Sequence, residues 1–169
     1  MVESILKGKT ILAVDDEPDV LSVLEEEIKE AYPDSIVDKA TTYKDASERL
    51  ASWTYELVIL DIMGVRGFDL LKNAALRQFP VVMLTAHALN PQALRQSIEL
   101  GARAYLPKEK IGEIVPFLED VLRYENLSGW ARLLQNLGGF FNSRWGENWK
   151  RIDEKFWKDF DDKIAFIRK

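Results

Sequence analysis

The sequence contains ILAVDD at residues 11–16 and LVILD at residues 57–61, two apolar runs that each end in aspartate. Both runs are apolar throughout instead of alternating between apolar and polar residues. A strand that is buried on both faces of a sheet has this composition, because neither face meets water. The two runs therefore predict central strands of a parallel sheet with carboxylates at their carboxyl ends.

Further β-rich runs and helical patterns alternate along the chain. The expected strands are Thr10–Val14, Ser35–Asp38, Leu57–Leu60, Val81–Leu84 and Ala104–Leu106, and the expected helices are Pro18–Tyr32, Thr42–Trp53, Phe68–Leu76, Asn90–Leu100 and Ile111–Tyr124. Apolar residues at spacings of three and four indicate the helices, and Asn90, Pro91 and Gly101 are suited to begin and end the fourth. Five β–α alternations predict a parallel sheet with helices on both faces. In such sheets ligands bind outside the carboxyl ends of the strands, where the winding reverses.

The composition is that of a globular protein and changes near residue 125. The formal charge is −5 overall; residues 1–124 carry 14 Lys/Arg and 21 Asp/Glu (−7), and residues 125–169 carry 9 and 7 (+2). An acidic main body argues against a nucleic-acid surface there, since Lys and Arg bind phosphate backbones. Four of the five tryptophans lie after residue 125. We therefore predict two parts, residues 9–124 and residues 125–169.

The sequence has no cysteine, which excludes disulfides and thiolate metal sites. The start, MVESILKGKT, lacks the basic and long apolar regions of a signal peptide. The longest nearly uncharged runs, such as Phe79–Asn90, are too short to span a membrane. We expect a soluble, cytoplasmic protein without a membrane span.

Polar side chains follow four of the expected strands. Asp15 and Asp16 follow the first strand, Asp61 the third and Thr85 the fourth, and Lys108 lies two residues beyond the fifth. Three neighbouring carboxylates repel one another unless a cation lies among them, and oxygen ligands suit Mg²⁺. Lys108 supplies a positive charge for an anion and Thr85 a hydrogen-bond donor. The set therefore indicates a phosphoryl acceptor beside a magnesium ion.

Each of these residues also has a simpler interpretation. Asp15 and Asp16 could cap the first helix, because aspartate is favoured at that position. Asp61 could be a turn residue, Thr85 a β-branched strand residue and Lys108 a solvated lysine. Their common place at one edge of the predicted sheet favours a functional site.

Four segments together resemble the response regulator receiver domain: ILAVDDEPDV (11–20), LVILDIM (57–63), VVMLTAHA (81–88) and GARAYLPKE (101–109). The resemblance covers about residues 9–124. It implies a doubly wound, flavodoxin-like α/β fold with five parallel strands in the order 2-1-3-4-5, here followed by a helical extension. The loop at residues 61–67 is about two residues shorter than is usual in the family, and it borders the implied metal site.

The resemblance also implies roles for individual residues. Asp61 would attack a phosphohistidine of a histidine kinase or phosphotransfer protein. Asp15, Asp16, Asp61 and the backbone carbonyl of Met63 would bind Mg²⁺. Met63 and His87 would flank the water that later removes the phosphoryl group.

Four further residues have implied roles around the phosphoryl group. Thr85, Ala86 and Lys108 would bind it. Tyr105 would couple the site to the face formed by the fourth helix, the fifth strand and the fifth helix. The alternative for Tyr105 is an ordinary surface aromatic residue.

The C-terminal part carries an aromatic stripe. After Gly138 and Gly139, apolar residues recur at spacings of three and four: Trp145, Trp149, Ile152, Phe156, Phe160, Ile164 and Ile167. We predict an amphipathic helix of about six turns over residues 144–168. The stripe could pack on its own receiver, form a homodimer through this helix or the Tyr105 face, bind a partner protein, or lie on a membrane surface. No DNA binding is expected, because a basic recognition helix is lacking.

Four functions compete. A phosphorylation-dependent switch would act through binding to a downstream protein. A magnesium-dependent phosphatase of the haloacid dehalogenase type needs a second aspartate where Met63 stands, and a nucleotide-binding module needs a glycine-rich loop after the first strand. A scaffold that is no longer phosphorylated would explain the shortened loop. We predict the switch, a response regulator of a two-component system or phosphorelay, which is no enzyme beyond its own phosphorylation and autodephosphorylation.

Overall fold

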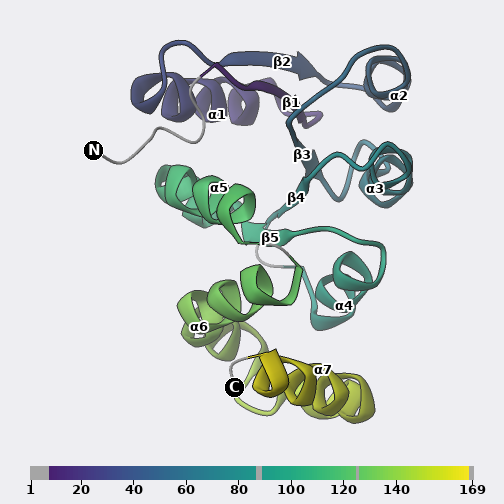
Figure 1. Ribbon diagram of the computed structural model, residues 1–169, viewed down its shortest axis with the longest axis vertical. Coiled ribbons are helices and arrows are strands. Elements are labelled where there is room, and N and C mark those ends of the chain that lie inside the picture. Colours follow the sequence, from purple (N-terminus) through teal and green to yellow (C-terminus); the bar gives the residue numbers. More distant parts are fainter. Residues whose placement is uncertain (1–7, 87–88, 125, 168–169) are drawn as a thin grey trace.

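A computed structural model describes residues 8–86, 89–124 and 126–167 of the chain (Figure 1). Its five strands are β1 (Thr10–Val14), β2 (Ile36–Ala40), β3 (Leu57–Asp61), β4 (Val81–Thr85) and β5 (Ala104–Pro107). They form one parallel sheet in the order β2-β1-β3-β4-β5. The predicted fold class and strand order are confirmed. The winding reverses between β1 and β3, so the carboxyl ends of these two strands are the expected place for a site.

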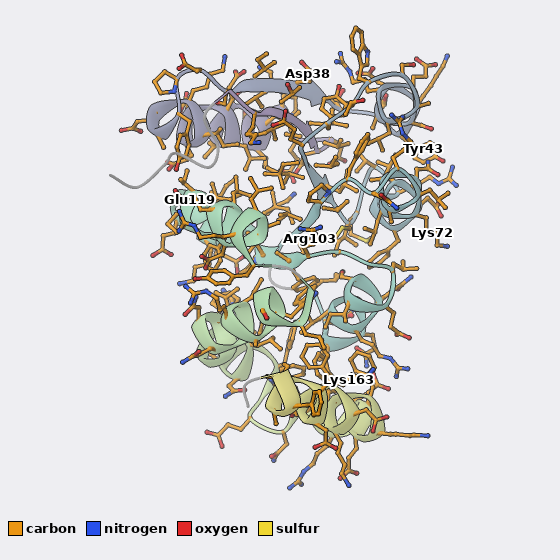
Figure 2. All side chains as sticks on the ribbon, in the orientation of Figure 1. Asp38, Tyr43, Lys72, Arg103, Glu119 and Lys163 are labelled. Carbon is orange, nitrogen blue, oxygen red and sulfur yellow. The ribbon has the colours of Figure 1, made fainter. Side chains whose placement is uncertain are left out.

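Five helices cover the two faces of this sheet. They are α1 (Pro18–Ala31), α2 (Tyr43–Ser52), α3 (Gly67–Leu76), α4 (Pro91–Glu99) and α5 (Ile114–Arg123). In Figure 1, α1 and α5 lie on one side of the sheet and α2, α3 and α4 on the other. Every residue of β3 and β4 is buried, as the uninterrupted apolar runs predict. Side chains fill the space between the sheet and both helical layers (Figure 2).

Local signals set the bounds of α4. The side chain of Asn90 accepts a hydrogen bond from the backbone N–H of Ala93 at 2.8 Å, and Pro91 occupies the first turn. Gly101 follows the helix with φ +95°, a left-handed conformation that glycine adopts without strain. At α5 the predicted start is too early, because a 3-10 helix, η2 (Lys108–Glu113), precedes it.

The predicted single helix over residues 144–168 is wrong. Helix α6 (Asn126–Trp145) ends at the start of this range, and Gly146 turns the chain with φ +87°. A 3-10 helix, η3 (Trp149–Asp153), then leads into α7 (Glu154–Ile167). Helix α6 runs through Gly138 and Gly139, although two adjacent glycines in a sequence suggest a helix break. Its large buried residues recur at spacings of three and four: Trp130, Leu133, Leu137 and Phe141. Packing of this stripe outweighs the weak helix propensity of the glycines.

The extension folds against its own receiver, one of the alternatives weighed for it. Helix α6 packs on α5 and β5, and α7 lies beside α6 (Figure 1). The indole N–H of Trp130 donates to the backbone carbonyl of Ala102 at 3.0 Å. The face around Tyr105 is therefore covered by the chain itself. Among the described residues, no helix is long and apolar enough to cross a membrane.

Candidate functional site

An acidic pocket lies where β1 and β3 end. Asp15 and Asp16 follow β1, and Asp61 is the last residue of β3. One carboxylate oxygen of each residue lies within 4.8 Å of the others. Asp15 is fully buried and Asp61 nearly so, whereas Asp16 is exposed. The three carboxylates predicted to meet at this edge do meet.

Lys108 joins the pocket from the end of β5. Its Nζ lies 2.9 Å from Oδ2 of Asp15 and 3.3 Å from Oδ1 of Asp61. It also lies 3.2 Å from a carboxylate oxygen of Glu17, which is not among the predicted site residues. The signal for Glu17 was its place directly after the two aspartates. One ammonium group thus contacts three carboxylates.

The electrostatics of the pocket favour an additional cation. Burial, followed by the negative charge of Asp15, raises the pKa of Asp61 to about 6 despite the opposing Lys108. Burial also raises the pKa of Asp15. Burial alone would lower the pKa of Lys108, but the hydrogen bond to Asp15 and the charge of Asp61 outweigh it and raise that pKa. Two buried carboxylates and one ammonium leave negative charge uncompensated.

This donor set fits Mg²⁺, which prefers hard oxygen ligands and one or two carboxylates. Asp15, Asp16 and Asp61 would supply the side-chain oxygens. Met63 lies in the turn after β3 with its side chain exposed, so its backbone carbonyl is the remaining predicted ligand. The exposure of Asp16 leaves one side of the site accessible to solvent.

Two glycines close the short β3–α3 turn against the pocket. A Cβ atom on Gly64, whose φ is +83°, would lie 2.4 Å from Oδ2 of Asp16. A Cβ atom on Gly67 would lie 2.1 Å from the backbone oxygen of Asp61. The Gly67 contact is with backbone, which cannot move aside, so this position requires glycine. The Asp16 side chain near Gly64 can move, but the positive φ of Gly64 itself favours glycine. The short loop is evident in the sequence, but the contacts of these two glycines are not.

Thr85 and Tyr105 lie beside the pocket. Thr85 is the buried last residue of β4, and Asp61 pairs in register with its neighbour Leu84. The side chains of Thr85 and Tyr105 are hydrogen-bonded to each other, and the Tyr105 hydroxyl also donates to the carbonyl of Asn90 at 3.5 Å. Tyr105 is fully buried, so it is not a surface aromatic residue.

The last two predicted site residues follow Thr85. Ala86 is exposed directly after β4 and presents only a methyl group. His87 lies outside the described residues. The arrangement as a whole can hold a divalent cation between carboxylates and an anion beside Lys108 and Thr85.

Fold and pocket together define a class of protein: flavodoxin-like α/β domains with a carboxylate cluster at the switch point of the sheet. The family model of the response regulator receiver domain matches residues 11–118, more than half of the chain. The chain therefore belongs to the response regulator receiver family.

Three solved structures illustrate the similarity. A provisionally assigned response regulator from Chloroflexus aurantiacus J-10-fl is 27% identical, with a TM-score of 0.61, over 70% of this chain and 100% of that one. A CheY-like receiver domain protein from Methanospirillum hungatei JF-1 is 25% identical, with a TM-score of 0.60, over 68% and 94%. The N-terminal domain of a response regulator/sensory box/GGDEF protein from Carboxydothermus hydrogenoformans is 25% identical, with a TM-score of 0.59, over 68% and 94%. A search of curated proteins found no match.

Proposed function

We propose that this protein is a phosphoacceptor response regulator that receives a phosphoryl group on Asp61. The observation that carries the proposal is the contact of Asp61 with Lys108 beside Asp15 and Asp16. Nucleophile, counter-charge and cation ligands then lie within one pocket. Phosphoryl transfer needs little else, because positioning and charge neutralisation account for most of its catalysis.

The placement of these groups supports the following transfer. A carboxylate oxygen of Asp61 forms a bond to phosphorus while the bond to the imidazole nitrogen of a phosphohistidine breaks, and the electron pair stays on that nitrogen. Lys108 and the hydroxyl of Thr85 hold the phosphoryl oxygens. Mg²⁺, when bound, would neutralise charge that develops on the transferred oxygens. The phosphodonor would be a histidine kinase or a phosphotransfer protein.

A switch must also lose the phosphoryl group in order to return to its unphosphorylated state. A water oxygen forms a bond to phosphorus, the bond to Asp61 breaks, and its electron pair returns to the carboxylate as inorganic phosphate leaves. We propose that Met63, whose side chain is exposed, and His87 flank this water. Output would be binding to a downstream protein, with residues 9–124 as the receiver and residues 125–169 as its extension.

The test uses acetyl phosphate with Mg²⁺ and intact-protein mass spectrometry. The wild type should gain one phosphoryl group, and Asp61→Asn should gain none. Asp34→Asn is the matched control, because Asp34 is an exposed aspartate in the turn before β2, away from the carboxyl ends of the strands. An unmodified wild type with native circular dichroism would refute the proposal and support the scaffold. Sustained turnover of phosphate esters would support the phosphatase instead.

A further inference from the structure

The C-terminal extension holds Tyr105 between aromatic rings. The Tyr105 ring centroid lies 6.1 Å from that of Phe141 and 6.4 Å from that of Trp145. Phe141 and Trp145 are stacked on each other at 4.7 Å with an interplanar angle of 3°. Tyr105 and Phe141 are both fully buried. Two rings of α6 thus pack against one ring of β5.

The other end of Tyr105 contacts Thr85, whose strand lies next to the strand that ends in Asp61. The Tyr105 hydroxyl group is hydrogen-bonded to Thr85, which ends β4. Strand β4 pairs with β3, which ends in Asp61. One side chain therefore connects the tail to the residue beside the proposed phosphoacceptor.

The hydrogen bonds from these two hydroxyls to backbone carbonyls are long. Thr85 Oγ1 donates to the carbonyl of Ala86 at 3.4 Å, and the Tyr105 hydroxyl donates to the carbonyl of Asn90 at 3.5 Å. Ordinary hydroxyl hydrogen bonds are about 2.7–2.8 Å long. A phosphoryl group on Asp61 adds three strong acceptor oxygens. Thr85 can then donate to a phosphoryl oxygen and accept from Tyr105, and such a chain of hydrogen bonds strengthens each member.

We propose that Phe141 and Trp145 are positioning residues that act through Tyr105 and stabilise the phosphoryl-bearing state of Asp61. This inference rests on the proposed function. The extension is then a positive regulator built into the chain, because the tail and the phosphoryl group favour the same buried Tyr105. Coupling between two sites is reciprocal, so phosphorylation must also stabilise the docked tail.

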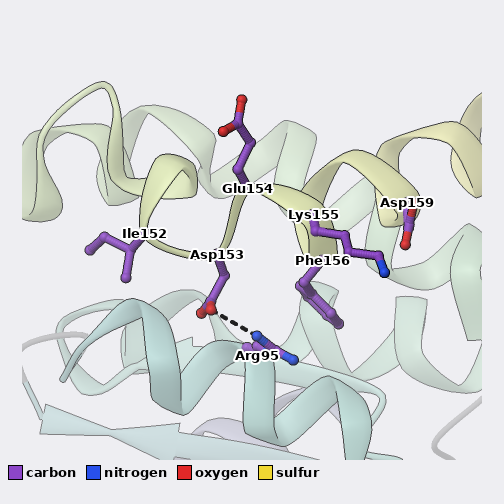
Figure 3. A pocket seen from close by; sticks show the side chains of 7 residues that line it. All are labelled: Arg95, Ile152, Asp153, Glu154, Lys155, Phe156 and Asp159. Carbon is purple, nitrogen blue, oxygen red and sulfur yellow. Dashed lines mark hydrogen bonds and ion pairs between the residues drawn. The ribbon is translucent and has the colours of Figure 1, made fainter.

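Several contacts hold the C-terminal extension on the receiver, so that it can keep Tyr105 in place. Beyond the Trp130 hydrogen bond, Arg144 of α6 forms an ion pair with Glu109 at 2.9 Å. Arg95 of α4 pairs with Asp153 at 2.7 Å and lies 4.7 Å from the centre of the Phe156 ring (Figure 3). In the sequence, Trp130 precedes Phe141, Arg144 lies between Phe141 and Trp145, and Asp153 follows Trp145. Movement of the two rings away from Tyr105 therefore requires release of several contacts.

Beryllium fluoride with Mg²⁺ tests the coupling as an equilibrium, because it mimics an aspartyl phosphoryl group without a covalent reaction. Its affinity is measured by ¹⁹F NMR titration of the full chain. Phe141→Ala should weaken binding about fivefold or more, the lower end of ordinary coupling between sites. Tyr105→Phe, which keeps the ring but removes the hydroxyl, should weaken it similarly. In the Tyr105→Phe background, Phe141→Ala should have no further effect on affinity.

The matched control is Leu133→Ala, a buried residue of the same helix that lines a small cavity together with Val121 of α5. It should lower the melting temperature while leaving the affinity for beryllium fluoride unchanged. Phe141→Leu keeps apolar volume and provides a folded variant if Phe141→Ala unfolds; its affinity should fall between the wild type and Tyr105→Phe. Hydrogen exchange over residues 140–153 should slow when beryllium fluoride binds the wild type.

The outcomes separate the two proposals. Wild-type protein that binds no beryllium fluoride and gains no phosphoryl group refutes the proposed function itself. Normal wild-type binding with unchanged affinity in the Phe141 variants overturns only the positioning role of Phe141 and Trp145. An equal loss of affinity from Phe141→Ala with and without the Tyr105 hydroxyl also overturns it, because Phe141 would then not act through that hydroxyl.

Discussion

The ammonium group of Lys108 lies 2.9 Å from the buried carboxylate of Asp15, although β3 and β4 separate their strands in the sheet. The lysine side chain therefore spans the carboxyl edge from one side of the pocket to the other. Among the described residues, Lys108 is the only cationic side chain in contact with the carboxylates of Asp15 and Asp61. It leaves the pocket with a net negative charge.

Asp61→Asn should stabilise the magnesium-free protein in a pH-dependent way. Burial and Asp15 raise the pKa of Asp61 from 3.8 to about 6, so ionisation of this group opposes folding. This destabilisation by the ionised Asp61 is complete above about pH 6. It vanishes as the pH falls below 3.8, the pKa of this group in the unfolded chain. The gain in unfolding free energy should be about 1–3 kcal/mol at pH 7.5 and near zero at pH 4. Urea unfolding in EDTA measures it.

Asp34→Asn serves as the control, because Asp34 is exposed and lies in the turn before β2, away from the pocket. The gain in unfolding free energy from Asp61→Asn could instead grow as the pH falls, opposite to the expected trend. That result would contradict a raised pKa in the folded protein.

Mg²⁺ should raise the melting temperature of the wild type, because it binds the folded pocket and not the unfolded chain. Asp16→Asn should weaken Mg²⁺ binding about tenfold or more by removing one ligand. Asp16 is exposed, so the substitution should leave the magnesium-free melting temperature nearly unchanged. Calorimetric titration gives the affinity. Asp19→Asn, an exposed aspartate in the first turn of α1, should bind Mg²⁺ as the wild type does.

Gly67→Ala should destabilise the protein by about 2 kcal/mol or more. The added methyl group would lie 2.1 Å from the backbone oxygen of Asp61, and backbone cannot move aside as a side chain can. Gly139→Ala is the matched substitution in α6, where a Cβ atom meets nothing within 4 Å. It should stabilise the protein by about 0.5–1 kcal/mol, because alanine favours helix. Chemical denaturation of both variants checks the pair; equal effects would mean that the turn is not closed on the pocket.

Trp130→Phe should cost about 1–2 kcal/mol by removing the 3.0 Å hydrogen bond to the carbonyl of Ala102, which is buried. Trp53→Phe makes the same chemical change at a residue that is 63% exposed, and should cost less than about 0.5 kcal/mol. Thermal unfolding of the two variants gives the comparison. If both substitutions had the same small effect, α6 would not be docked on the receiver in solution.

The parts of the fold that follow from local patterns were predicted well. The apolar runs at residues 11–14 and 57–60 predict central strands, and those strands are buried on both faces. Asn90 and Pro91 predict the start of α4 because their hydrogen bonding is local. The roles proposed for Asp61, Thr85 and Lys108 stay predictions, although the structure brings these residues to one edge of the sheet.

The misses share one physical cause. Gly138 and Gly139 disfavour helix locally, yet α6 continues through them because its opposite face is packed. Gly146 is also a glycine in this region, but its backbone is left-handed and the helix ends before it. Glu17 and Gly64 acquire their contacts with the pocket only when separate strands are brought together. Sequence spacing does not encode such contacts.

The parallel sheet, its central strands and the acidic residues at their ends can be inferred from the residues alone, because burial on both faces and strand-end polarity are local properties. The packing of the aromatic extension on Tyr105 and on its own α4–β5–α5 face becomes evident only in the folded chain. An aromatic stripe has the same spacing whether it packs on its own chain, a second copy or a membrane. The hydrophobic effect requires that the stripe be buried, and the shape and charge of the available surfaces select where.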